Sequence, residues 1–258
     1  MHEWGWLVAI YLFLGGLGAG ALAVAAVFEL TGKRYEFDFC PVTLVGATVP
    51  GPVVLAGTVL LIFDLGAGLR EPWRIAYMLT HLSSVMTWGV WILSLFLPIS
   101  FLYGFLEVMD TYPSAWEWVK SRKTLRRFNF LENLPVRRVK RIMAGVGGVL
   151  AVGVAVYTGV LISAVGPAVP FWSTDVLPFI PIPMLPLLFL VSALSTGIGL
   201  TVDLAATLSV RDMAHRVRRL PLIHLAAIGV ETLLLGMLLI TAFLDGGAAA
   251  QAARDIVV

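Results

Sequence analysis

The sequence predicts an all-α, polytopic membrane protein with about six transmembrane helices. Of its 258 residues, 59% are hydrophobic and only 13% are charged, whereas a water-soluble domain normally has about a quarter of its residues charged. Six apolar runs reach the roughly 20 residues that a transmembrane helix needs; they lie at about 5–28, 42–65, 82–106, 142–165, 184–206 and 222–244. These runs are continuous and about twice as long as the alternating strands of a membrane barrel, so helices are expected.

The positive charges predict the orientation in the membrane. If the six runs alternate in direction, the loops near 29–41, 107–141 and 207–221 lie on one side and contain every Lys and Arg residue except Arg70, Arg74 and Arg254. Cytoplasmic loops of membrane proteins carry the excess of Lys and Arg. The sequence therefore predicts a multi-pass protein of the cytoplasmic (inner) membrane with both termini outside.

The loop at 107–141 is the longest, and it combines basic residues with aromatic ones such as Trp116 and Phe128. Such a segment could bind nucleic acid or a partner protein. An interfacial amphipathic helix attracted to anionic lipid is the better interpretation for a segment next to the membrane, so we expect no nucleic acid partner.

The sequence is poor in residues that hold metal centres. Its single cysteine, Cys40, excludes a disulfide framework and a cysteine set for an iron–sulfur cluster. The four histidines are too scattered to predict a pair of facing haem ligands. We expect no haem or metal in this chain, so any metal centre would belong to a partner.

Four groups that can exchange protons come from four different runs at a similar depth near the outer side. They are Tyr11, Asp64, His81 and Tyr157. Ionisable groups in a membrane are costly and are functional candidates by default, and a convergence of this kind predicts a small-ligand site between helices. A quinone head group has two carbonyl oxygens that take up protons on reduction, so it needs such partners in an otherwise apolar pocket.

Each of these residues also has a structural interpretation. A tyrosine near a membrane interface is often an anchor in the aromatic belt, and His81 can lie among the lipid head groups. Asp64 can form a salt bridge with Arg70 or Arg74, the two outer arginines that we otherwise assign to partner docking.

A second group lies toward the cytoplasmic side. Glu231 is about 13 Å inside the last run at 1.5 Å per residue, and His224 precedes it by two turns on the same face. Asp203 lies near the inner end of the fifth run. These three residues predict an inner proton path, although Glu231 could instead be held by a hydrogen bond to a neighbouring helix.

Several segments, in order along the sequence, resemble the NrfD/PsrC family. They are Leu14-Gly15-Gly16-Leu17-Gly18-Ala19-Gly20, Asp64-Leu65-Gly66 with Arg70-Glu71-Pro72-Trp73-Arg74, Ser84-Val85-Met86-Thr87-Trp88-Gly89, Tyr157-Thr158-Gly159-Val160-Leu161, and 185–197. Each motif alone is weak, but five in order make the resemblance specific. Close packing between helices alone would also account for small residues such as Gly16 and Gly20.

The resemblance implies a haem-free, quinone-interacting membrane subunit. Such a subunit docks on its outer face to a four-cluster iron–sulfur subunit and, in many members, through it to a molybdopterin or multihaem catalytic subunit. The family's quinone pocket uses a tyrosine of the fourth helix, which corresponds to Tyr157. The helix 1 histidine of some members corresponds to Tyr11. Members commonly have eight helices, so this protein is a shortened member, or two helices are missing or come from another polypeptide.

We therefore expect two parts: a quinone-binding bundle of four helices over 1–165, including the basic loop, and helices 5 and 6 with an outer tail over 166–258. The predicted function is that of a membrane anchor subunit of a respiratory oxidoreductase complex, exchanging electrons between the quinone pool, such as menaquinone, and a peripheral iron–sulfur subunit. A secondary transporter is the alternative, but it would predict inverted repeats, and the halves show none. A purely structural anchor would leave Asp64 and Tyr157 unexplained as a pair.

Overall fold

The structure is a computed structural model. It describes residues 6–32, 41–64, 80–81, 84–112, 114–115, 117, 121, 135–164, 175–177, 180–208, 220–245, 250–251 and 254.

Among the described residues, six helical segments are long and apolar enough to cross a membrane, so the predicted fold class is confirmed. The helices are α1 (Trp6–Leu30), α2 (Pro41–Thr48), α3 (Pro50–Asp64), α6 (Val85–Thr111), α8 (Val136–Ala164), α9 (Met184–Leu208) and α11 (Leu220–Asp245). Helices α2 and α3 together form the second crossing. With 25 residues, α1 is about 37 Å long, which exceeds the roughly 30 Å of a bilayer core.

Prolines mark where several of these helices begin. Pro41 and Pro50 are the first residues of α2 and α3, a position where the missing N–H is not needed. Pro135 directly precedes α8, and its carbonyl oxygen accepts hydrogen bonds from the backbone N–H groups of Arg138 and Val139 at 2.8 and 3.0 Å. Pro98 lies inside α6, where it removes one backbone hydrogen bond of the helix.

A short antiparallel ribbon precedes α9. It consists of β1 (Asp175–Leu177) and β2 (Ile180–Pro183). Pro181 and Pro183 lie in β2, which pairs with β1 in a two-stranded sheet, and an edge strand of this kind tolerates proline.

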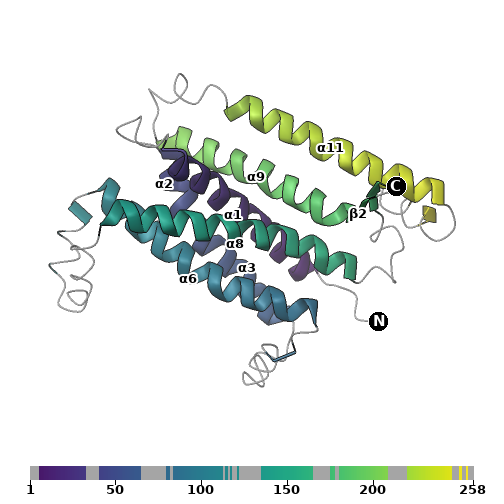
Figure 1. Ribbon diagram of the computed structural model, residues 1–258, viewed down its shortest axis with the longest axis horizontal. Helices are drawn as coiled ribbons and strands as arrows, with labels where there is room; N and C mark the ends of the chain where they lie inside the picture. Colours follow the sequence, from purple (N-terminus) through teal and green to yellow (C-terminus); the bar gives the residue numbers. More distant parts are fainter. Residues whose placement is uncertain are drawn as a thin grey trace.

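Helix α1 lies at the centre of the bundle, between α8 and α9, with α11 at the edge beside α9 (Figure 1). Small residues bring the backbones together. A side chain at Gly20 would overlap the carbonyl group of Ala193, and one at Gly159 would overlap the backbone of Pro186. The largest core cluster contains residues of α1, α2, α3, α6 and α8, so most of the crossings share one interior.

The two ends of the bundle are named here after the ends of α1. The Trp6 side is where α1, α6 and α9 begin and α3, α8 and α11 end. The Leu30 side is the opposite end, where α2, α8 and α11 begin.

Candidate functional site

Two buried tyrosines meet near the Trp6 side. Tyr11 of α1 has only 1% of its surface exposed and Tyr157 of α8 has 8%. Helices α1 and α8 run in opposite directions with Leu22 packed beside Gly147, and Tyr11 and Tyr157 lie about equally far from that contact toward the Trp6 side, so the two phenol groups lie at the same level and within electrostatic range of each other. Two of the four residues predicted to form the outer group are therefore neighbours inside the bundle, and neither has the exposed position of an aromatic-belt anchor.

Glycines on two further helices make room for these rings. The Tyr157 ring lies against Gly89 of α6, so a side chain at position 89 would overlap its Cζ, Oη and Cε1 atoms. At Gly57 of α3, an added Cβ atom would lie 3.5 Å from Cδ2 of Tyr11. The pair of phenols is thus enclosed by α1, α3, α6 and α8, which are the crossings expected to form the quinone-binding bundle.

Of the other outer candidates, His81 is the one whose side chain is among the described residues. His81 is exposed ahead of α6; its Nδ1 atom lies 3.2 Å from the hydroxyl group of Thr80, and its carbonyl oxygen accepts a hydrogen bond from the Ser84 N–H at 2.9 Å. Asp64 is the last residue of α3, and its side chain lies outside the described part of the protein. Arg70 and Arg74 lie outside the described residues as well.

The inner group lies along the contact between α9 and α11. The His224 ring packs against Gly199, where an added Cβ atom would lie 3.1 Å from Cε1. Its Nδ1 atom is buried and has no hydrogen-bond partner among the described residues. Asp203, one turn further along α9, is exposed, and Glu231 is half-buried. From the Leu30 side inward, the order is Asp203, His224, Glu231, with about 10 Å between the last two.

A buried ionic cluster on the Leu30 side was not predicted. The Lys140 Nζ atom of α8 donates a hydrogen bond to Asp110 Oδ2 at 2.6 Å and lies 2.8 Å from Glu107 Oε2, both on α6. Glu29 Oε2 of α1 is 4.0 Å away. The side chains of Lys140, Glu29 and Glu107 are at most 1% exposed. This Lys140 cluster therefore ties the ends of three helices together in a region of low dielectric constant, where charges remain only when paired.

The cluster escaped prediction because its members lie just beyond the expected apolar runs. α6 continues to Thr111 rather than ending near 106, and α8 begins at Val136 rather than near 142. Two features of the sequence could have indicated the cluster. Acidic residues follow two of the apolar runs on the same side of the bundle on which a lysine precedes a third run. In addition, Glu107 and Asp110 are three residues apart and therefore share one face of a helix.

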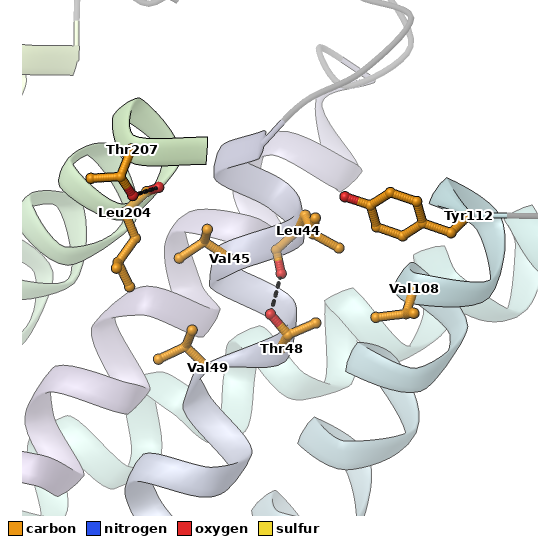
Figure 2. A pocket seen from close by; sticks show the side chains of 8 residues that line it. All are labelled: Leu44, Val45, Thr48, Val49, Val108, Tyr112, Leu204 and Thr207. Carbon is orange, nitrogen blue, oxygen red and sulfur yellow. Dashed lines mark hydrogen bonds between the residues drawn. The ribbon is translucent and has the colours of Figure 1, made fainter. Parts of the chain in front are cut away.

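A hollow of about 310 Å³ lies elsewhere, on the Leu30 side (Figure 2). Its lining comes from α2, the α2–α3 junction, the C-terminal end of α6 with the residue that follows it, and α9; it consists of Leu44, Val45, Thr48, Val49, Val108, Tyr112, Leu204 and Thr207. The hydroxyl groups of Thr48 and Thr207 donate hydrogen bonds to carbonyl oxygens of their own helices, at 2.7 Å each. The hollow is therefore almost wholly apolar, and it lies at the opposite end of the bundle from Tyr11 and Tyr157.

Comparisons with known proteins give a consistent result. The family model described as "Polysulphide reductase, NrfD" matches residues 2–258. The protein is 35% identical over 204 residues to the C subunit of the polysulfide reductase of Wolinella succinogenes; the match spans 76% of this sequence and 56% of that protein. It is 30% identical over 202 residues to Protein NrfD of Escherichia coli, a match that spans 75% of this sequence and 57% of that protein. It thus spans little more than half the length of these curated relatives. No solved structure matches it.

Proposed function

The protein belongs to the NrfD family, and we propose that it is the membrane subunit of a respiratory oxidoreductase, exchanging electrons between a quinone pool, such as menaquinone, and a peripheral iron–sulfur subunit. The observation that carries this proposal is the pair of buried phenols, Tyr11 and Tyr157, enclosed by four apolar helices. A secondary transporter would be expected to have inverted repeats and a site between broken helices at the middle of the membrane, and the family to which the protein belongs does not favour that alternative.

The residues at the tyrosine pair suit a quinone head group. When bound, a quinone supplies two carbonyl oxygens that accept protons together with electrons. Each phenol O–H can donate a hydrogen bond to such an oxygen, and the surrounding aliphatic and glycine positions suit a ring with an apolar tail. Tyr157 and Tyr11 would hold and orient the head group. His81 and Asp64, toward the Trp6 side, would pass protons between this site and the aqueous phase.

The distribution of charges supports the proposed orientation, and the family relationship supports the proposed partner. The basic loops near 29–41, 107–141 and 207–221 would face the cytoplasm, so the tyrosine pair would lie near the outer surface. An iron–sulfur subunit with four clusters, in turn bound to a molybdopterin or multihaem catalytic subunit, would dock there, with Arg70 and Arg74 as contacts. A short distance between quinone and nearest cluster favours electron transfer.

Tyr157→Phe tests the proposal. The substitution removes one hydroxyl group and leaves the ring, so quinol-dependent reduction of the iron–sulfur clusters in the purified complex should fall at least about tenfold, the effect of losing one hydrogen bond in the transition state. Assembly of the complex, measured by size-exclusion chromatography, should not change. Tyr103→Phe is the matched control, because Tyr103 is also fully buried but lies on α6 toward the Leu30 side. Equal rates for wild type and Tyr157→Phe would contradict the assignment.

We also propose that Asp203, His224 and Glu231 form a proton path from the Leu30 side, supported by their order along α9 and α11. Glu231→Gln should slow proton exchange with that side in proteoliposomes containing a trapped pH dye, while the KM for quinol stays unchanged. The exposed Glu117 provides the control, Glu117→Gln. Equal rates of proton exchange in the Glu231→Gln and Glu117→Gln variants would rule this path out.

A further inference from the structure

Gly89 occupies an unusual position on α6, because the ring of another helix takes the space that a side chain would fill. A Cβ atom at this position would overlap three atoms of the Tyr157 ring, including the hydroxyl oxygen. The helix around it is otherwise continuous from Val85 to Thr111. Glycine inside a helix is less favourable than alanine by about 1 kcal/mol, so its presence here needs a compensating contact, and the Tyr157 phenol supplies one.

The contact bears on function because it involves the reactive end of the tyrosine. Among the three overlapping atoms are Cζ and Oη of Tyr157, so the hydroxyl group lies directly beside the backbone of α6. The α6 backbone at Gly89 therefore limits where this hydroxyl group can lie. Gly153, one turn before Tyr157, behaves differently: an added Cβ atom there would meet Ile92 of α6 at 3.6 Å, an ordinary van der Waals distance.

We propose that Gly89 is a positioning residue for the quinone site: the lack of a side chain at this point of α6 holds the Tyr157 hydroxyl group beside Tyr11, where both can bind one head group. This inference rests on the proposed function. Any side chain at position 89 moves the phenol away from α6 and breaks the alignment, while the rest of the bundle keeps its packing.

The test is a double-mutant cycle in the purified complex with its partner subunits, using a soluble quinol analogue as electron donor. Gly89→Ala should lower kcat/KM about tenfold, as Tyr157→Phe does, because both disturb one hydrogen bond. Adding Gly89→Ala to Tyr157→Phe should cause no further loss, because the hydroxyl group is already absent. Gly153→Ala, at the same helix interface, should keep wild-type turnover.

The outcomes separate the two proposals. If Tyr157→Phe has no effect on kcat/KM, the proposed site fails and the role of Gly89 fails with it. If Tyr157→Phe lowers kcat/KM but Gly89→Ala does not, only the role of Gly89 is overturned. It is overturned also if the two losses multiply, because general loosening of the bundle would act in the Tyr157→Phe background as well.

A further variant covers the case in which Gly89→Ala does not fold. Removing the ring with Tyr157→Ala removes the overlap, so the double variant Gly89→Ala with Tyr157→Ala should be recovered at the yield of Tyr157→Ala alone. Failure of that recovery would show that a side chain at position 89 disturbs something other than Tyr157, and would overturn the proposal.

Discussion

Lys140→Met is expected to lower the free energy of unfolding by about 3–5 kcal/mol, the usual cost of removing one partner from a buried ion pair. Methionine keeps the length of the side chain but removes the charge that faces Asp110, Glu107 and Glu29 at 2.6, 2.8 and 4.0 Å. The buried Glu107 and Glu29 carboxylates, whose side chains are at most 1% exposed, then lose the Lys140 cation, whereas the Asp110 side chain keeps contact with solvent at 30% exposure. Reversible titration with a denaturing detergent, followed by loss of helicity, measures the effect.

The neighbouring exposed base provides the control for this experiment. Arg138 is two residues before Lys140 on the same helix and is exposed, so Arg138→Met should change stability by less than about 1 kcal/mol. Adding Glu107→Gln to Lys140→Met should restore part of the loss, because one uncompensated charge is removed. Equal stabilities of the Lys140→Met and Arg138→Met variants would show that the cluster contributes little.

Gly20→Ala is expected to have the second large effect, a loss of at least about 3 kcal/mol. A methyl group at this position overlaps the carbonyl oxygen of Ala193, and it would lie 3.2 Å from the Gly197 Cα atom. Both obstacles are backbone, which cannot rotate away as a side chain can, so α1 and α9 must separate along their contact. The yield of monodisperse protein and its apparent melting temperature provide the measurement.

Gly16→Ala is the matched substitution, one turn earlier on the same face of α1. Its added Cβ atom would lie 3.7 Å from the Cβ atom of Ala193, an ordinary contact, and alanine favours the helix by up to about 1 kcal/mol. We therefore expect Gly16→Ala to be as stable as wild type or more so. If both variants were equally stable, the close crossing of α1 and α9 would not be needed for folding.

The crossings could be predicted because burying apolar residues in lipid is a local property of each run. The ends of the helices could not be predicted in the same way. Lys140 lies in α8 and Glu107 in α6. A helix predicted from hydropathy stops at the first charged residue, because the prediction does not include an opposite charge on a neighbouring helix. Their inclusion depends on the tertiary contact between them, and no single run contains that information.

The candidate site was partly predictable for a related reason. Helix direction and the rise per residue place Tyr11 and Tyr157 at similar depth, and the structure brings them together. Depth does not determine which way a side chain points around its helix. That is why the contact of Tyr157 with Gly89 came only from the structure, and why His81, at a similar expected depth, is found exposed ahead of α6.

The central position of α1 has a consequence for biosynthesis. This helix leaves the ribosome before the other described helices, but α8 and α9, which flank it, begin only at Val136 and Met184. At a synthesis rate of roughly 5–20 residues per second, α1 waits on the order of ten seconds for the first of them. During that time its glycine face meets lipid or the insertion machinery. A variant such as Gly20→Ala should therefore enter the membrane normally and be removed afterwards by proteases that recognise unassembled helices.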